Sequence, residues 1–243
     1  MERRINDFQT LEDLKEGCIL LMDKPLEWTS FDVVNKVRGT IRRKFQVKKI
    51  KVGHAGTLDP LATGLLVICI GKMTKQIQYL TADDKTYTGT IMLGATTPSY
   101  DLETEVDAEF PTEHIDSEAI AKANETFLGE QLQTPPIFSA KKIDGKRAYQ
   151  SAREGKEVKM RQAQVTIHRF ETKTDQLPEV PFEVECSKGT YIRSLAYDFG
   201  KALESGGHLT ELRRTKSGEF DVKDAWSLEE FQAHIDALPT PVE

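Results

Sequence analysis

The sequence has few of the features that mark secreted or metal-dependent proteins. Only three cysteines occur in 243 residues, and their wide spacing argues against a disulfide framework. We expect Cys18, Cys69 and Cys186 to be buried free thiols, because each lies in an apolar or alternating run. The five histidines show no metal-ligand spacing, so we expect no metal site.

The chain also lacks a long hydrophobic segment. The longest nearly continuous apolar stretch, 61–70, is far shorter than the roughly 20 residues that span a bilayer, and the N-terminus has no apolar signal region. These absences predict a cytoplasmic protein with no membrane partner. Hydrophobic residues make up 38% and charged residues 30%, which is typical of a folded chain rather than a disordered one.

The net charge of −6 by itself disfavours a nucleic-acid partner, but the basic residues are clustered. The segment 36–51 contains eight basic residues and no acidic one: Lys36, Arg38, Arg42, Arg43, Lys44, Lys48, Lys49 and Lys51. The segment 141–161 contains eight bases and three acids. This distribution lets a polyanion bind one face while acidic faces remain elsewhere. Solvated charged faces without any partner are the alternative interpretation.

The spacing of apolar residues predicts several strands and helices. We expect strands at 18–22, 86–95, 137–143, 164–172 and 182–186, and helices at 30–45, 117–128, 192–203 and 227–238. Thr29 or Ser30 caps the first helix, whose expected apolar face consists of Phe31, Val34, Val37, Ile41 and Phe45. A tight turn at 144–145 and a short helix to Arg153 are also expected, and the segment 61–71 fits either a helix or a strand.

Strands and helices are interspersed without strict alternation. We therefore predict an α/β fold of the α+β type, with a mixed, largely antiparallel sheet flanked by helices. No repeat, low-complexity tract or clear linker divides the chain. The sequence accordingly predicts a single domain spanning 1–243.

The most informative segment is the glycine-bearing loop from Gly53 to Pro60. Its glycines allow unusual backbone angles or the close approach of a ligand. Pro60 biases Asp59 toward an extended conformation, which fixes how the carboxylate projects. On these residues alone, an Asp-Pro turn with a solvated side chain is the simpler interpretation.

A family resemblance changes this interpretation. The run GHAGTLDPLATGLL at 53–66 closely resembles the signature of the TruB family, the bacterial tRNA pseudouridine-55 synthases. Other segments are similar to family motifs in the same order, namely LMDKP at 21–25, DKTY at 84–87, SKGTYIR at 187–193 and LTELRR at 209–214. The resemblance covers about 18–220 and implies the pseudouridine synthase fold. It also implies an isomerase, an intramolecular transferase, that acts on uridine 55 in the T-loop of tRNA.

The implied chemistry needs a carboxylate and no cofactor. The glycosidic bond between N1 and C1′ breaks, the base turns, and C5 joins C1′, so nothing is oxidised and no atoms are gained. A carboxylate beside C1′ attacks covalently or assists proton removal, through an acylal, a base adduct or a glycal. The resemblance implies that Asp59 is this carboxylate and that Arg193 pairs with it and keeps it ionised. Tyr87 is expected to stack on the uracil and to be able to move a proton.

The resemblance also implies substrate contacts. Tyr191 and Leu212 are expected to line the pocket, and Lys24 and Pro25 to shape its floor. A base inside a folded loop must be extruded, at a cost of a few kcal/mol, and His54 is expected to fill the vacated space or touch flipped nucleotides. Phosphates of the T-arm stem-loop are expected to meet basic residues of 36–51, chiefly Arg42, Arg43, Lys48 and Lys49. Surface charge or core packing is the plain alternative for each side chain.

The sequence departs from the family pattern in three respects. Ala55 stands where threonine is common, and Lys141 stands where an aliphatic residue is expected. Many members continue into a small C-terminal PUA domain that grips the acceptor side of tRNA. This chain stops after one further helix, so we expect that domain to be absent.

Two other functions fit the same resemblance. One is an RNA-binding or RNA-folding module without catalysis, which the joint presence of Asp59, Tyr87, Tyr191 and Arg193 disfavours. The other is a synthase within a guide-RNA particle acting on ribosomal RNA, which the expected lack of a PUA domain and of a lysine-rich tail disfavours. We expect a monomer that binds tRNA and needs no protein partner.

Overall fold

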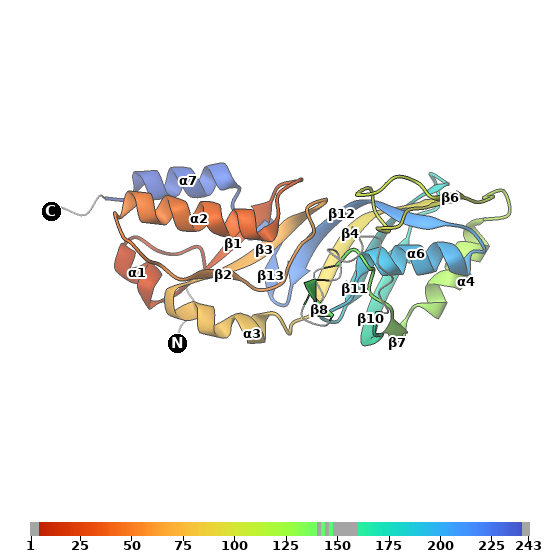
Figure 1. Ribbon diagram of the computed structural model, residues 1–243, viewed down its shortest axis with the longest axis horizontal. Coiled ribbons are helices and arrows are strands. Elements are labelled where there is room, and N and C mark those ends of the chain that lie inside the picture. The colour runs from red at the N-terminus through yellow and green to blue at the C-terminus, as the bar shows by residue number, and fades with distance from the viewer. Residues whose placement is uncertain (1–4, 140–141, 144–145, 148–159, 240–243) are drawn as a thin grey trace. The chain divides into compact units, whose positions relative to one another are not determined.

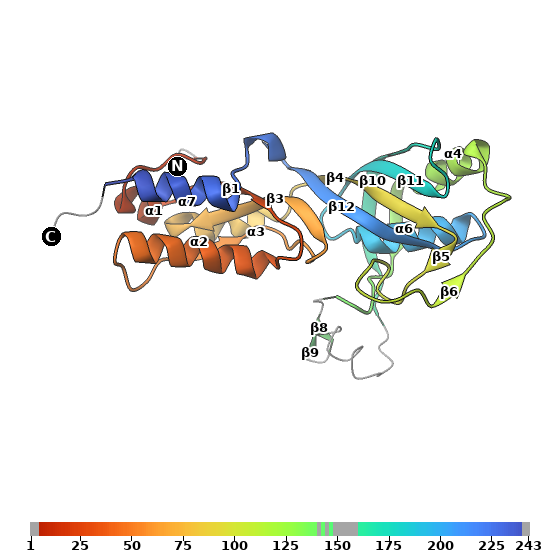
Figure 2. The same ribbon diagram turned by 90° about the horizontal axis from the view of Figure 1, so that it is seen from above.

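The computed structural model describes residues 5–139, 142–143, 146–147 and 160–239 (Figures 1 and 2). The chain divides into two compact units, one formed by Met1–Thr86 and Arg213–Glu243 and the other by Tyr87–Leu212. The strand pairs described below are antiparallel, and helices pack against them, so the predicted fold class is confirmed. The prediction of one catalytic domain over 1–243 is not tested by this division and stays a prediction.

The first unit is built around strand β3. On one side β3 (Ala62–Ile70) pairs with β1 (Cys18–Lys24), and β2 (Val52–His54) pairs with the last residues of β3. The end of β12 (Gly207–Ser217) continues the strand order beyond β3 and pairs with β13 (Phe220–Asp221). The helical elements are α1 (Leu11–Glu16), α2 (Ser30–Lys44), η1 (Gly71–Gln76), α3 (Ile77–Leu80), η2 (Val222–Asp224) and α7 (Leu228–Ala237).

Both faces of the β1–β3 pair are buried. Alternate residues of each strand enter two different apolar clusters: Cys18, Leu20, Met22, Leu66, Ile68 and Ile70 in one, and Ile19, Leu21, Leu65, Val67 and Cys69 in the other. The first cluster includes side chains of α2 and α7, and the second includes side chains of η1 and α3. A strand buried on both faces has a continuous apolar sequence. The segment 61–71 therefore gave no periodicity from which to choose helix or strand.

Helices α2 and α7 lie side by side in both views (Figures 1 and 2). Thr29 caps α2 in a capping box with Asp32, which confirms the predicted start of this helix. Val33, Val34, Val37 and Ile41 supply its buried apolar face. The placement of Phe31 on that face was wrong, because its side chain is 61% exposed. The buried positions begin at Ser30 and continue at 33 and 34, which leaves 31 on the solvent side.

The second unit contains the strand order β12, β4 (Lys85–Leu93), β11 (Glu179–Cys186), β10 (Ala163–Thr172) and β7 (Gly129–Gln133). Its other elements are β5 (Ala95–Thr96), β6 (Ala108–Glu109), α4 (Ser117–Thr126), β8 (Lys142–Ile143), β9 (Lys146–Arg147) and α6 (Ile192–Ala202). The rings of Phe127, Phe170 and Phe199 meet edge to face, with centroids 5.4 to 6.3 Å apart. These contacts pack α4 and α6 against β10.

Most predicted elements agree with the structure, but one predicted strand is wrong and several observed elements were not predicted. The predicted strand at 137–143 is wrong, because 137–139 form a bend and β8 covers only 142–143. The elements that were not predicted are the long strand β12, helices α1, α3, η1 and η2, and the short strands β2, β5, β6, β7, β9 and β13. The turn at 144–145, Lys141, the short helix to Arg153 and most of the basic segment 141–161 lie outside the described residues.

Two other expectations concern cysteines and membrane segments. The three cysteines are buried free thiols, as expected, and burial raises the pKa of Cys69 to about 12. Among the residues that the structure describes, no helix is both long enough and apolar enough to cross a membrane.

Candidate active site

The predicted site residues are divided between the two units. The first unit contains Lys24, Pro25, Arg42, Arg43, Lys48, Lys49, His54 and Asp59, and the second contains Tyr87, Tyr191, Arg193 and Leu212. The ion pair expected between Asp59 and Arg193 stays a prediction.

Asp59 is half-buried in the connection from β2 to β3. Its carbonyl accepts a hydrogen bond from the Ala62 N–H at 3.1 Å, which closes a tight turn through Pro60. The preceding residue, Leu58, is buried, and both of its backbone groups bond to the Ser30 hydroxyl. The Leu58 N–H donates to Ser30 Oγ at 2.8 Å, and Ser30 Oγ donates to the Leu58 carbonyl at 3.1 Å. Since Ser30 begins α2, the backbone before Asp59 is fixed to the start of that helix.

Lys24 fixes the turn from its other side. Its side chain is fully buried, and its amine donates to the carbonyl oxygens of Pro25 at 2.9 Å, Trp28 at 2.6 Å and Pro60 at 3.3 Å. Burial lowers the Lys24 pKa from 10.5 to about 8, and the nearby Asp59 carboxylate opposes this shift. Lys24 therefore holds the backbone around Asp59 and places a buried amine near the Asp59 carboxylate. Pro25, the next residue, is half-buried.

Arg214 is a buried guanidinium to which the sequence analysis gave no separate role. Its Nε donates to the Leu65 carbonyl at 2.7 Å, and its Nη2 donates to the Gly56 carbonyl at 3.1 Å. Gly56 has a φ of +108°, a conformation that favours glycine. The GHAGTLDP loop is thus tied to β12 as well as to α2 and β1. The charged residues of LTELRR hide the alternation of this strand, so no signal in the sequence separates Arg214 from Arg213.

His54 ends β2 and is half-buried. Desolvation is the main cause that lowers its pKa, and the charge of Arg214 adds to the effect. Within the described part of the chain, its buried Nδ1 has no hydrogen-bond partner. A neutral imidazole of this kind suits contact with bases better than with phosphates.

Arg193 lies in the first turn of α6 and is only 4% exposed. Its Nη1 donates to the Ser99 carbonyl at 3.1 Å, and its Nε lies 3.6 Å from Oδ2 of the buried Asp101. Asp101 also accepts the Glu103 N–H at 3.0 Å, so its own carboxylate is held in place. The guanidinium of Arg193 is therefore oriented by a segment that the sequence analysis did not single out.

Three further predicted residues lie in the second unit. The Tyr191 backbone is held on both sides by the buried Gln133 amide, which accepts its N–H at 2.8 Å and donates to its carbonyl at 3.0 Å. Tyr87 is 9% exposed near the start of β4, and Leu212 is half-buried in β12.

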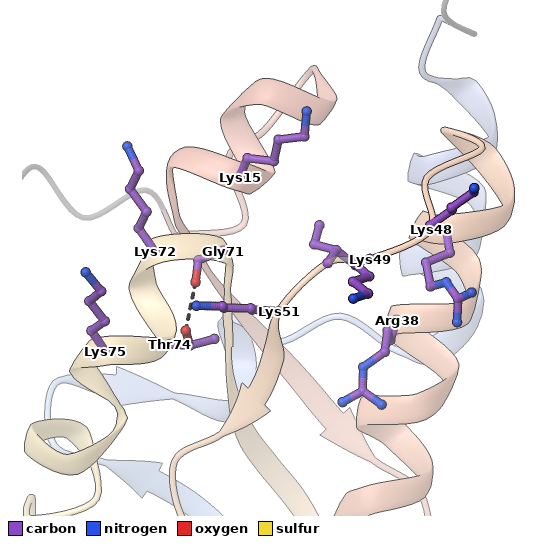
Figure 3. Close-up of a pocket in the computed structure, with 11 residues that line it drawn as sticks. Lys15, Arg38, Lys48, Lys49, Lys51, Gly71, Lys72, Thr74 and Lys75 are labelled. Atoms are coloured by element: carbon purple, nitrogen blue, oxygen red, sulfur yellow. Dashed lines mark hydrogen bonds between the residues drawn. The ribbon is translucent and has the colours of Figure 1, made fainter.

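The predicted phosphate-binding residues do not all face the same way. Arg42, Lys48 and Lys49 line a basic hollow of about 710 Å³ in the first unit (Figure 3). Arg43 instead donates to Oε1 of Gln232 on α7 at 3.3 Å. Three of the four residues thus share one concave surface.

Comparisons with known proteins match nearly the whole chain. Residues 42–192 match the family described as TruB family pseudouridylate synthase (N terminal domain), and 193–238 match the tRNA pseudouridylate synthase B C-terminal domain. A protein named tRNA pseudouridine synthase B from Flavobacterium johnsoniae is 58% identical over 227 residues, covering 93% of this chain and 99% of the relative. A protein of the same name from Phocaeicola vulgatus is 54% identical, covering 92% and 95%.

A solved structure is also similar. A chain in the crystal structure of a Cbf5-Nop10-Gar1 complex superposes with a TM-score of 0.67 at 28% identity. The match covers 90% of this chain but 54% of that longer one. The motif at 53–66, the family match over more than half of the residues and the identity to these relatives agree. The chain therefore belongs to the TruB family of pseudouridylate synthases.

Proposed function

We propose that this protein isomerises uridine to pseudouridine in tRNA, at position 55 of the T-loop. The observation that carries the proposal is 58% identity, over 99% of its length, to a protein named tRNA pseudouridine synthase B. The chain retains the loop that presents Asp59, and three buried polar side chains, Ser30, Lys24 and Arg214, hold the backbone of that loop. A binding module would not need a carboxylate carried on a backbone held in this way.

Asp59 is the proposed catalytic residue. In the reaction, the bond from N1 to C1′ breaks, the base turns, and C5 joins C1′; C5 loses its proton to solvent and N1 takes up a proton, so the composition of the nucleotide is unchanged. A carboxylate beside C1′ supports this by covalent attack or by assisting proton removal. The hydrogen bonds that hold the Asp59 turn limit the positions that the carboxylate can adopt. This restriction lowers the entropic cost of placing the carboxylate beside the sugar.

Arg193 is the proposed cation that keeps Asp59 ionised. Its guanidinium is always charged, and Ser99 and Asp101 orient it within the second unit. Tyr87 is proposed to stack on the uracil, and Tyr191 and Leu212 to contact the base. Neutral His54 is proposed to meet the nucleotides displaced when the target base is extruded.

We further propose that the enzyme acts in the cytoplasm, as a monomer and without a protein partner. Sedimentation of the purified protein during turnover tests the second part. A monomeric species that modifies tRNA supports the proposal, whereas activity confined to a dimer or to a complex with another protein contradicts it.

Turnover on a defined RNA tests the function itself. Purified protein is incubated with an unmodified tRNA transcript, without added metal or nucleotide, and pseudouridine is mapped at single-nucleotide resolution. We expect modification at uridine 55 alone, because the isomerisation needs no redox partner and no energy donor. A transcript with uridine 55 replaced by cytidine is the control. Modification of that control, or none of the original transcript, contradicts the proposal.

A further inference from the structure

The hollow in Figure 3 is strongly basic. Of the eleven described residues that line it, eight are lysine or arginine and none is acidic. Arg38 and Arg42 come from α2, and Lys48, Lys49 and Lys51 come from the connection to β2. The opposite wall comes from α1 and η1. We call this surface the basic basin.

The charges of the basic basin are only partly neutralised by the protein. Lys15 pairs with Glu12 at 3.2 Å and Lys72 with Glu16 at 2.8 Å, both on exposed side chains where such pairs contribute little. Arg38 is tied to the Asn35 side chain and the Val52 carbonyl. Within the part of the chain that the structure describes, no carboxylate pairs with Arg42, Lys48, Lys49, Lys51 or Lys75. These five cations therefore repel one another across one concavity.

Capping of a helix does not account for this arrangement. Arg42 lies in the last turn of α2, where a cation stabilises the terminal carbonyls. Lys48, Lys49 and Lys51 follow the helix, and their side chains are exposed. A cluster of like charges that gives the fold no such benefit is typical of a surface that binds an anion.

The basic basin lies at the opposite end of the first unit from the Asp59 turn. Ser30, which bonds to Leu58, begins α2, and Arg42 lies twelve residues further along that helix. At 1.5 Å per residue this separation is about 18 Å. Strand β3 leads in the same way from the turn to Gly71 at the rim of the basin. An anion bound there is therefore not the phosphate of the reacting nucleotide.

We propose that the basic basin binds backbone phosphates of the tRNA substrate that lie away from the reacting uridine, an inference that rests on the proposed function. Lysine and arginine are the side chains that neutralise nucleic-acid phosphates. None of the described lining residues is aromatic and able to stack on a base, and the Thr74 hydroxyl already donates to the Gly71 carbonyl at 2.8 Å. The surface therefore suits several successive phosphates rather than a single nucleotide.

A matched pair of variants tests this proposal. The basin variant combines Arg42→Gln, Lys49→Gln and Lys51→Gln, and the control combines Lys122→Gln, Lys201→Gln and Lys216→Gln, which are exposed cations elsewhere with the same total charge change. Kd for the full-length tRNA transcript is measured across a salt series. We expect the basin variant to bind about tenfold more weakly at low salt and to lose about two to three from the slope of log K against log salt. The control keeps the wild-type affinity and slope.

Chemical protection gives a second readout on the wild-type protein. Acetylation of Lys48, Lys49, Lys51 and Lys75 is quantified by mass spectrometry with tRNA, with tripolyphosphate and without ligand. Protection by tRNA supports the proposal. Protection by tripolyphosphate but not by tRNA overturns it, as does a basin variant that binds like the control. Because wild-type turnover on tRNA is measured separately, either of those results can occur while the enzyme remains active, and the proposed function then stands.

Discussion

Lys24 is a buried amine that, among the residues the structure describes, donates to three carbonyl oxygens near the Asp59 turn. Because three carbonyl oxygens hold the Lys24 amine in place, we interpret Lys24 as a residue that stabilises the turn rather than one that transfers protons. Its burial nevertheless costs stability while the amine is charged, since desolvation is the largest cause of its lowered pKa.

The pKa of Lys24 predicts how stability depends on pH. Native Lys24 loses its proton above about pH 8, whereas unfolded Lys24 keeps it up to about pH 10.5. Between these values the unfolded state binds more protons, so this residue makes the free energy of unfolding rise with pH. We expect the stability of the wild type relative to Lys24→Met to increase by about 2 kcal/mol from pH 7.5 to pH 10. Urea denaturation at both pH values measures it. If the difference in the free energy of unfolding between the wild type and Lys24→Met is the same at both pH values, the lowered pKa of Lys24 is contradicted.

Asp101 is a proposed positioning residue for Arg193. Asp101→Asn keeps the shape of the side chain but removes the charge beside a buried guanidinium. We expect the rate at saturating tRNA to fall about 10- to 100-fold as the guanidinium shifts. The free energy of unfolding should fall by about 1–3 kcal/mol.

The control for this substitution is Asp175→Asn, an exposed carboxylate in the same unit. It should leave both the rate and the stability unchanged. An Asp101→Asn protein that is less stable but reacts at the wild-type rate would show that Asp101 serves folding alone.

Among the secondary-structure elements, two glycines of the first unit are expected to respond in opposite ways to substitution by alanine. Gly64, within β3, has a φ of +100°, and an added Cβ would lie 2.3 Å from the Arg214 carbonyl oxygen. We expect Gly64→Ala to lower the free energy of unfolding by about 2–4 kcal/mol through backbone strain and collision with β12.

Gly39, inside α2, has open space around its Cα and supplies the contrasting case. Gly39→Ala should stabilise the protein by about 0.5–1 kcal/mol, because alanine is the better helix former. Denaturant titrations of both variants measure the two changes. Equal effects of the two substitutions would contradict the close approach of β3 and β12.

Amphipathic elements were predictable from the sequence, and elements buried on both faces were not. Helices α2, α6 and α7 have one apolar face and recognisable caps or periodicity, so their ranges were found. Strand β3 has no polar face, and β12 carries charged residues that hide its alternation. Phe31 was misplaced because hydrophobicity alone does not show on which side of a helix the core lies.

The candidate site was predictable to the extent that a motif identified it. Asp59 and Arg193 were found through the family resemblance. Ser30, Arg214 and Asp101 were not, because a side chain that bonds to a distant backbone or guanidinium leaves no periodic signal. Such partners are set by tertiary contacts between segments far apart in the sequence.

At the scale of the whole molecule, the net charge of −6 conceals a basic surface. The net charge was therefore a poor guide to the partner, whereas the number of basic residues in 36–51 favoured a polyanion such as RNA. Because these local charges are expected to contact phosphates, tRNA binding should weaken as the salt concentration rises. The reaction at Asp59 takes place at the sugar of one nucleotide, and this sugar carries no charge. Binding and catalysis are expected to be separable.

Comparison of the wild type with Asp59→Asn shows whether the Asp59 carboxylate carries out the isomerisation. Asparagine keeps the size of the side chain but cannot act as a carboxylate toward C1′. Kd for a tRNA transcript and the pseudouridine formed at uridine 55 are measured for both proteins. We expect Asp59→Asn to bind tRNA as the wild type does and to form no pseudouridine. Pseudouridine formation at the wild-type rate by Asp59→Asn would contradict it.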